Sequence, residues 1–182
     1  MGAENRYNAQ GQRMVAGCIP YRREKDSDTV EILMVRSQNG HNIVFPKGGW
    51  EVDESVQDAA IREAQEEAGV HGHVRDELGV WIFHKRSHQQ WETNPDGACE
   101  VHMFLLEVTQ ELDTWPEQHR GRVWIDLNEV EKITLERCHH NWMREALGIF
   151  IQKQTSSSLI AEASPNEPRH TLSFNASVRC RL

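Results

Sequence analysis

Three glutamates in the segment "REAQEEAGV" have the types and spacing to do chemistry: Glu63, Glu66 and Glu67. At positions i, i+3 and i+4 they share one face of a helix, where like charges repel by about 0.2–0.5 kcal/mol per pair. A charged run of this kind is most often a helix face wetted by solvent. The alternative is a bound cation that offsets the repulsion, and hard divalent cations such as Mg²⁺ bind carboxylate and backbone carbonyl oxygens.

The surroundings of these glutamates favour the cation. In a helical projection the carboxylates lie beside the stripe of small residues Ala60, Ala64 and Ala68, not opposite it, so we expect them at the edge of a cleft. The segment "FPKGG", residues 45–49, comes just before the helix, and its two glycines allow the backbone to approach a ligand. Helix and loop together predict a site for Mg²⁺ that the phosphates of a substrate complete.

Predicted strands and helices must position this site. Apolar and alternating runs predict the strands, and helical periodicity predicts the helices, of which the glutamate helix ends at Gly69. The expected strands are residues 13–22, 30–36, 79–85, 101–109 and 122–127, with a short apolar run at 43–50, and the expected helices are 54–68, 128–133 and 139–152. This order predicts one α/β domain over residues 13–153. We expect a flexible N-terminus at residues 1–12 and a flexible tail rich in Ser and Pro at 154–182.

Composition excludes several classes of protein. The 182 residues are 38% hydrophobic and carry a net charge of −8, which disfavours binding to long nucleic acids or anionic membranes. No run of 18 apolar residues indicates a membrane span. The four cysteines are scattered without a CxxC pair, which favours a reducing compartment. The first residues lack the apolar core of a secretory signal and indicate an organelle transit peptide only faintly. We therefore expect a monomer in the cytoplasm or the nucleus.

The glutamate segment also carries a family resemblance. Gly48, Glu54 and "REAQEEAGV" match every fixed position of the Nudix box, so the chain resembles the Nudix hydrolases. The resemblance implies a Nudix fold, an α/β/α sandwich with a mixed β-sheet. The segments "FPKGGWE", "EEAGV" and "ELDTWPEQHRGRVWIDL" are similar to the diphosphoinositol polyphosphate phosphohydrolase branch, particularly its plant-like members. One departure is Lys47, which stands where animal relatives tend to have a third glycine.

The resemblance implies metal-assisted attack of water on a phosphoanhydride. Glu63 and Glu67 are then the principal ligands of Mg²⁺, for which Mn²⁺ can substitute, with the Lys47 backbone carbonyl as a further ligand. Glu66 is the expected general base or an additional metal ligand. A carboxylate beside a cation has a lowered pKa and is a poorer base, so Glu66 and Glu67 both stay candidates for handling the water.

Further residues are expected to hold the glutamate helix and its loop in place or to bind the substrate. The resemblance implies that Gly48 shapes the loop and that Glu54 and Arg62 form an ion pair that orients the helix. Cations are also needed for the substrate phosphates, because arginine grips phosphate bidentately and lysine acts as a point charge. The resemblance places four candidates near the phosphates: Arg13, Arg36, Lys47 and Arg120. Trp50, Trp81 and Trp91 could stack on an adenine, although packing is the ordinary role of such residues.

The expected partner is a small-molecule polyphosphate. The branch resemblance implies removal of the β-phosphate from diphosphoinositol polyphosphates and cleavage of diadenosine polyphosphates. One alternative is a pyrophosphatase for nucleoside-diphosphate-linked compounds, of the ADP-ribose or mRNA cap type. Another is a non-catalytic module that binds inositol pyrophosphates, and the complete set of acids in the motif counts against it.

Overall fold

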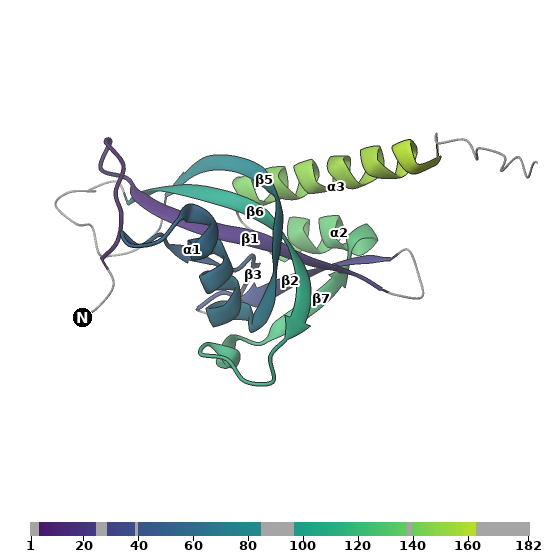
Figure 1. Cartoon of the computed structure of the whole chain (residues 1–182), viewed down its shortest axis with the longest axis horizontal. Coiled ribbons are helices and arrows are strands. Elements are labelled where there is room, and N and C mark those ends of the chain that lie inside the picture. Colours follow the sequence, from purple (N-terminus) through teal and green to yellow (C-terminus); the bar gives the residue numbers. More distant parts are fainter. Residues whose placement is uncertain (1–3, 25–28, 39, 85–96, 138–139, 163–182) are drawn as a thin grey trace, which may run out of the picture.

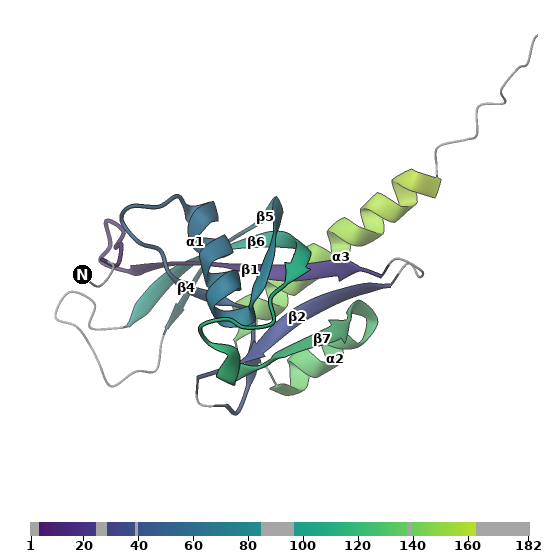
Figure 2. The same cartoon turned by 60° about the horizontal axis from the view of Figure 1, so that its bottom comes forward.

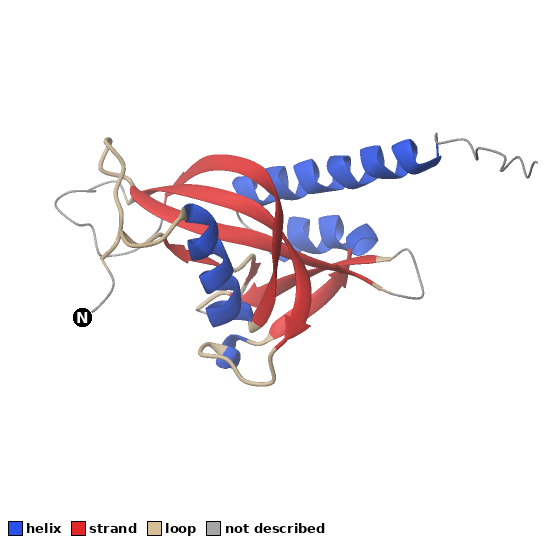
Figure 3. Cartoon of the chain, in the orientation of Figure 1, coloured by secondary structure: helices blue, strands red, loops and turns tan. Residues whose placement is uncertain are grey.

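The computed structural model describes residues 4–24, 29–38, 40–84, 97–137 and 140–162. In this part of the chain four strands come before the first helix, three strands follow it, and two helices come last (Figure 3). The strands are β1 (Arg13–Arg23), β2 (Val30–Arg36), β3 (Ile43–Val44), β4 (Lys47–Gly49), β5 (Val70–His84), β6 (Ala98–Glu111) and β7 (Arg122–Asp126). The helices are α1 (Val56–Glu63), the π-helical turn η1 (Ala64–Ala68), the 3₁₀ turn η2 (Gln118–Arg120), α2 (Leu127–Arg137) and α3 (Asn141–Glu162).

Within the described residues, seven strands form one mixed sheet. Its main path runs β3-β2-β1-β6-β5, while β4 pairs with β1 and β7 pairs with β2. The central strands β1 and β6 are parallel, and the other pairs are antiparallel. A mixed sheet of this kind needs cover on both faces, because its central strands are apolar on both sides.

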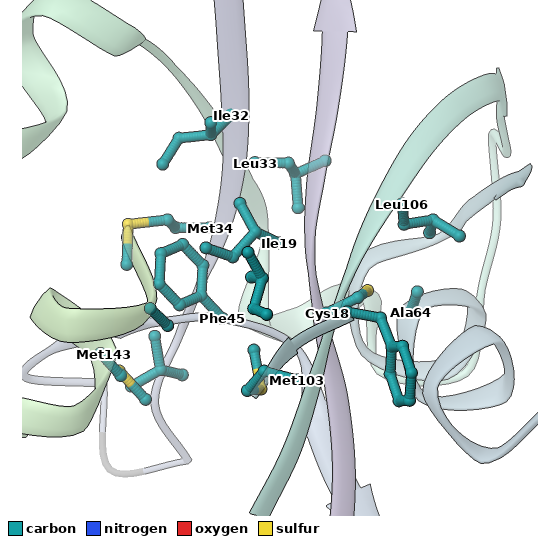
Figure 4. Close-up of a cluster of buried hydrophobic side chains, with 14 of the residues drawn as sticks. Cys18, Ile19, Ile32, Leu33, Met34, Phe45, Ala64, Met103, Leu106 and Met143 are labelled. Atoms are coloured by element: carbon teal, nitrogen blue, oxygen red, sulfur yellow. The ribbon is translucent and has the colours of Figure 1, made fainter. Parts of the chain in front are cut away.

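Helices supply that cover. α1 lies on one face of the sheet, and α2 and α3 lie on the other (Figures 1 and 2). Alternate side chains of β1 reach the two layers: the Cys18 thiol contacts the Ala60 carbonyl oxygen of α1 at 3.9 Å, and the Tyr21 ring lies 5.3 Å from that of Phe150 in α3. Figure 4 shows the same division, with Ile19 and Cys18 on opposite sides of the strand. The predicted α/β/α sandwich is confirmed.

Several element boundaries differ from the sequence prediction: β6, α2 and α3 are longer than expected, and the glutamate helix and β5 begin at other residues. The glutamate helix was expected from Glu54, but it begins at Val56, because the Ser55 hydroxyl caps it by accepting a hydrogen bond from the Asp58 backbone N–H at 3.1 Å. β5 begins at Val70, although only residues 79–85 were expected to form a strand. Three register shifts against β6 break the alternation of side chains in residues 70–78, which hides the strand pattern.

The two ends of the domain also differ from expectation. Residues 4–12, expected to be flexible, are attached to the loop after β4: the Arg6 N–H donates to the Trp50 carbonyl oxygen, and the Val52 N–H donates to that of Glu4. The Arg6 guanidinium lies 4.4 Å from the centre of the Trp50 ring. At the other end α3 continues to Glu162, so the expected tail starts within this helix, and residues 163–182 lie outside the described residues. Among the described helices, none has the length and apolarity to cross a membrane.

Candidate active site

The three glutamates lie where the helix widens. α1 ends at Glu63 and passes into the π turn η1, which carries Glu66 and Glu67. Such π turns are rare and occur frequently at functional sites. Glu63 and Glu67 are buried, with 8% and 7% of their surface exposed, whereas the Glu66 side chain is 43% exposed. All three line one cleft of about 1210 Å³, which confirms the prediction that they lie at a cleft and not on an open face.

Gly48 allows the glutamate helix to approach β4. A Cβ atom at this position would lie 2.1 Å from the Glu63 Oε1 atom, so any other residue would displace the carboxylate. The preceding residue, Lys47, donates its backbone N–H to Glu67 Oε2 at 3.0 Å. The short strand β4 therefore holds both buried carboxylates, and its Lys47 backbone is adjacent to Glu67, as a role for the Lys47 carbonyl in metal binding requires.

Arg62 connects the helix to the preceding loop. Its guanidinium makes two hydrogen bonds to the Glu54 carboxylate, at 2.7 and 3.0 Å, so the expected ion pair is present. It also donates to the Gly49 carbonyl oxygen at 2.8 Å, to Glu63 at 2.8 Å and to Glu66 at 3.2 Å. The hydrogen bonds from Arg62 lower the pKa of Glu54 and so keep that carboxylate ionised. Arg62 thereby fixes the loop geometry and balances part of the acidic charge.

The buried acids are still short of positive charge. Burial, together with the nearby charge of Glu67, raises the pKa of Glu63 to about 7 despite the hydrogen bond from Arg62. Burial also raises the pKa of Glu67, against the opposing effects of Lys47 and Arg120. Carboxylates that are expensive to ionise in this arrangement become favourable once a cation lies beside them.

The donor set fits a divalent metal ion after a local rearrangement. In the described part of the chain, no three His, Cys, Asp or Glu side chains already converge as a metal site. Arg62 occupies oxygens of Glu63 and Glu66, and Arg120 occupies one of Glu67. The Glu66 side chain is 43% exposed and its bond to Arg62 is the longest hydrogen bond from that guanidinium to a glutamate, so this contact is the one that a bound cation would most easily replace. Hard oxygen donors, burial and excess negative charge are the properties that Mg²⁺ or Mn²⁺ require.

Arg120 does not occupy the place expected of a phosphate ligand. Its side chain is 3% exposed and forms an ion pair with Glu67 and a second with Glu117 at 2.9 Å. Its Nε–H donates to the Arg36 carbonyl oxygen at 2.7 Å. The guanidinium is thus committed to protein oxygens, since a buried charge must be paired. Arg120 lines the cleft as a positioning residue for Glu67, which corrects the sequence assignment.

The other expected phosphate ligands divide into two groups. Arg13 and Lys47 line the cleft, and the Arg13 guanidinium is oriented by two hydrogen bonds to Asn5 Oδ1, at 2.8 and 3.1 Å. The Arg36 side chain is exposed and is not among the residues that line the cleft. Trp50, a candidate for stacking on adenine, instead donates its indole N–H to the Glu54 carbonyl oxygen at 2.9 Å. Trp91 lies outside the described residues.

The segment between β6 and β7 holds the C-terminal end of the glutamate helix. The Trp115 indole N–H donates to the Glu67 carbonyl oxygen at 3.2 Å, and the Glu117 backbone N–H donates to that of Glu66 at 3.0 Å. These bonds satisfy carbonyls that the end of a helix leaves without partners. Sequence reasoning missed both residues as parts of the site. Their only signal was their place within the family-like segment "ELDTWPEQHRGRVWIDL".

Gly69 completes this attachment. It adopts the left-handed conformation, with φ of 65°, and a Cβ atom there would lie 2.5 Å from the Trp115 ring. Its carbonyl oxygen accepts hydrogen bonds from the Leu112 backbone N–H at 2.8 Å and from Arg122 at 3.0 Å. Arg122 also lies over the Trp115 ring, 4.4 Å from its centre. The glycine that ends the helix therefore also gives the indole room to reach it.

Comparisons with known proteins agree with this architecture. A family model described as NUDIX domain matches residues 11–147. Nudix hydrolase 17, mitochondrial, of Arabidopsis thaliana is 42% identical, with 96% of this chain and 90% of that protein covered. Diphosphoinositol polyphosphate phosphohydrolase 3-alpha of Mus musculus is 30% identical over 73% of this chain and 74% of that protein. The crystal structure of a C. elegans Ap4A hydrolase binary complex has a TM-score of 0.60, with 79% of this chain and 98% of that chain covered. At 20% identity this likeness supports the fold alone.

The names of the plant relatives overturn one expectation. Four further Arabidopsis relatives, 44–46% identical, are named mitochondrial like Nudix hydrolase 17, and another at 43% is named chloroplastic. The expected cytoplasmic or nuclear location is therefore wrong. That expectation depended on the weak resemblance of the first residues to a transit peptide, and composition at a terminus is a poor guide when the signal is this faint.

Proposed function

The chain belongs to the NUDIX family, whose members are hydrolases of phosphoanhydride bonds that use divalent metal ions, and on this premise we propose that its substrates are diphosphoinositol polyphosphates. It removes their β-phosphate and also cleaves diadenosine polyphosphates. The observation that carries the proposal is the pair of buried carboxylates, Glu63 and Glu67, held against β4 in a cleft that Arg13 and Lys47 also line. The same cleft thus offers both a metal site and cations for a chain of phosphates.

The substrate class follows from charge and size. A cleft of about 1210 Å³ is large for a single phosphate group and suits a highly phosphorylated small molecule. The mouse relative at 30% identity is named for hydrolysis of diphosphoinositol polyphosphates, which supports the same class here. With its net charge of −8 the chain is unsuited to long nucleic acids or anionic membranes, and we propose that it acts as a monomer.

Each glutamate then has a distinct task. Glu63, Glu67 and the Lys47 carbonyl hold Mg²⁺, or Mn²⁺ in its place. When bound, the metal offsets the phosphate charge and makes water a better nucleophile. Both oxygens of Glu67 already accept hydrogen bonds, from the Lys47 N–H and from Arg120, so Glu67 is poorly placed to take a proton. Glu66 accepts a hydrogen bond from Arg62 on its Oε2 atom, but its side chain is 43% exposed and lines the cleft, so we assign to it the proton of the attacking water.

Arg13 and Lys47 bind the substrate phosphates. The two hydrogen bonds from Arg13 to Asn5 orient its guanidinium in the cleft before a substrate arrives. Gly49 has no side chain to obstruct it, since a Cβ atom there would lie 2.5 Å from the Arg13 terminal nitrogen. A preoriented arginine loses less conformational freedom on binding phosphate, which favours affinity.

The test is a comparison of turnover on three substrates: a diphosphoinositol polyphosphate, diadenosine hexaphosphate and ADP-ribose, each with Mg²⁺ and with Mn²⁺. We expect the first two to be cleaved and ADP-ribose to be the poorest. A strong preference for ADP-ribose would instead favour the nucleoside-diphosphate-linked class. Tight binding of the inositol compound without turnover of any substrate would favour a non-catalytic module.

The relatives' names also support a location. We propose that the protein acts in an organelle, as five Arabidopsis relatives with 42–46% identity are named mitochondrial. A fusion of the full chain to a fluorescent protein should colocalise with a mitochondrial marker in plant cells. Diffuse fluorescence in the cytosol would contradict the proposal.

A further inference from the structure

The first described residues of the chain, 4–8, form an arm that lies between β1 and the loop after β4. The Arg6 carbonyl oxygen accepts a hydrogen bond from the Met14 N–H of β1 at 2.9 Å, and the Arg6 N–H donates to the Trp50 carbonyl oxygen at 3.0 Å. Isolated β-bridges continue this pairing on each side of Arg6. The arm therefore joins β1 to the loop that leads into the glutamate helix.

One residue of the arm contacts a cleft residue. Asn5 Oδ1 accepts hydrogen bonds from Arg13 Nε and Nη2, at 3.1 and 2.8 Å, and Arg13 lines the cleft. A Cβ atom on Gly49 would lie 2.5 Å from that oxygen and 2.5 Å from Arg13 Nη2, so the glycine of β4 leaves room for the contact. Asn5 thus holds one edge of the guanidinium, and the opposite edge, at Nη1, is the one that can meet a phosphate.

Arg6 anchors the arm. Its Nη2 donates to the Val52 carbonyl oxygen at 2.6 Å, and its guanidinium lies 4.4 Å from the centre of the Trp50 ring. The Trp50 ring is itself fixed, because its indole N–H donates to the Glu54 carbonyl oxygen at 2.9 Å. A short segment with few buried contacts opens easily, so the position of Asn5 depends on these contacts of Arg6.

We propose that the arm sets the affinity of the cleft for phosphate, and that Arg6 is the residue that keeps the arm docked. Arg6 holds Asn5 in place, and Asn5 holds Arg13 ready for a phosphate. Arg6 and Asn5 are not among the residues that line the cleft, so both act as positioning residues. An arginine that is oriented in advance loses less conformational freedom on binding. The proposal rests on the proposed function in one respect, that Arg13 binds phosphate.

Kinetics of Arg6→Ala and Asn5→Ala test the arm. Each variant should raise KM about tenfold for both a diphosphoinositol polyphosphate and diadenosine hexaphosphate, because phosphate is common to the two. The kcat should stay within about twofold of the wild-type value, since neither side chain meets the reacting atoms. An unchanged KM in both variants, or a fall in kcat without a rise in KM, would overturn the proposal.

Arg22→Ala is the matched control for Arg6→Ala. Arg22 also lies over an indole ring, 4.1 Å from the centre of that of Trp124, but it does not line the cleft. KM for both substrates should not change in this variant. If Arg22→Ala raises KM as much as Arg6→Ala, the loss of any such arginine has the effect and the arm has no special role.

A double-mutant cycle tests the route through Arg13. Arg13→Gln removes the guanidinium, so Arg6→Ala should cause no further loss of affinity in that background. A full loss in the absence of Arg13 would refute the proposal. The affinity for Mn²⁺, measured by calorimetry without phosphate, should be the same in Arg6→Ala as in the wild-type protein. Weaker Mn²⁺ binding would contradict the proposal, because the effect would then reach the glutamates through Trp50 and Glu54.

Binding of a phosphate analogue separates the role of the arm from the proposed function. Methylenediphosphonate carries two phosphate-like groups joined through a carbon atom, so it is not hydrolysed. With Mg²⁺ present, the wild-type protein should bind it about tenfold more tightly than Arg6→Ala or Asn5→Ala, each first shown to be folded by urea denaturation. If neither polyphosphate is hydrolysed, the proposed function fails and this comparison still decides the role of the arm. Equal affinity of the wild-type protein and both variants would refute it.

Discussion

The acidic and the aromatic parts of the cleft wall are built in different ways. The acidic wall comes from one short stretch, Glu63 to Glu67, and is held by charged hydrogen bonds from Arg62, Arg120 and the Lys47 backbone. The aromatic wall joins Phe83 and His140, which are far apart in the sequence, and is held by ring packing. The acidic wall carries the groups proposed for the reaction itself, so changes in it should affect every substrate by the same factor. The aromatic wall depends on packing between segments that are far apart in the sequence.

Glu66→Gln tests this division most strongly. Without a base, kcat should fall about 10²–10⁴-fold, and by the same factor for a diphosphoinositol polyphosphate and diadenosine hexaphosphate. The free energy of unfolding should change little, by less than about 0.5 kcal/mol, because the side chain is partly exposed and its ion pair with Arg62 is weak at such a position. Steady-state kinetics and urea denaturation measure the two quantities. Glu77→Gln, an exposed glutamate of β5 outside the cleft, is the control. A near-native rate would exclude Glu66 as the base, and unequal losses would show that Glu66 also helps to recognise one of the substrates.

Gly48→Ala should give the next largest effect. The new methyl group would lie 2.1 Å from Glu63 Oε1, so the carboxylate must move, and a displacement of this size lowers kcat/KM about a hundredfold. Both substrates should again lose activity equally. Gly148→Ala in α3 is the matched control, because a Cβ there meets nothing within 4 Å. It should leave activity unchanged and stabilise the fold by about 0.5–1 kcal/mol. If Gly48→Ala retains full activity, the contact between Gly48 and Glu63 does not set the carboxylate position.

The buried acid also predicts a pH dependence of stability without metal. Because the pKa of Glu63 is about 7 in the folded state and 4.5 as the unperturbed value, the folded chain holds a proton that the unfolded chain releases between those pH values. Stability in EDTA should therefore fall as the pH rises from about 4.5 to 7, by on the order of 3 kcal/mol. Glu63→Gln should flatten this part of the profile in urea titrations. Added Mg²⁺ should restore stability at pH 8 in the wild-type protein only. Parallel profiles for the two proteins would contradict the assignment.

The smallest expected effect is that of Trp115→Phe. This change keeps the ring under Arg122 and removes only the indole N–H that donates to the Glu67 carbonyl oxygen. A lost hydrogen bond of this kind is worth about 1 kcal/mol, so the Mg²⁺ concentration for half-maximal activity should rise about fivefold for either substrate. Calorimetric titration with Mn²⁺ provides a readout apart from activity.

Trp124→Phe is the matched control for this change. Arg22 lies over the Trp124 ring, 4.1 Å from its centre, but the Trp124 indole N–H is buried and has no hydrogen-bond partner among the described residues. Metal affinity should not change in this variant. If both substitutions weaken metal binding equally, ring packing and not the hydrogen bond to Glu67 is the cause.

The acidic wall was largely predictable because the residues that form it lie in one short segment of the sequence. The spacing of Glu63, Glu66 and Glu67, the stripe of alanines and the preceding glycines all lie within a short segment. Local periodicity likewise predicted most strands and placed the start of each of the three longer helices within two residues, although α2 and α3 continue beyond the expected ends. The helical projection placed the carboxylates at a cleft even though the turn that carries Glu66 and Glu67 is a π turn, because the buried alanines fix the side of the helix that packs.

The features that the sequence did not predict depend on contacts between segments that are far apart in the chain. The burial of Arg120 between Glu67 and Glu117 follows from how the segment before β7 folds against the glutamate helix, and the nearby Glu117 alone does not indicate the pairing with the distant Glu67. The aromatic wall requires the register of β5 against β6 and the position of α3. The bulges in residues 70–78 hid half of that strand. Alternating apolar and polar residues indicate a paired strand only where no β-bulge interrupts the alternation.

The π turn at Ala64–Ala68 makes the motif sensitive to chain length. Gln65 is exposed, and its side chain is dispensable for packing. A π turn holds one residue more than an α turn, so deletion of Gln65 would let the turn close as an ordinary α-helix while the residues after it keep their places about the axis. The wide turn therefore sets the spacing between Glu63 and the two later glutamates, and with it the point at which Glu67 meets Lys47 and Arg120. In evolutionary terms, relatives that differ in length at this turn should differ in that spacing.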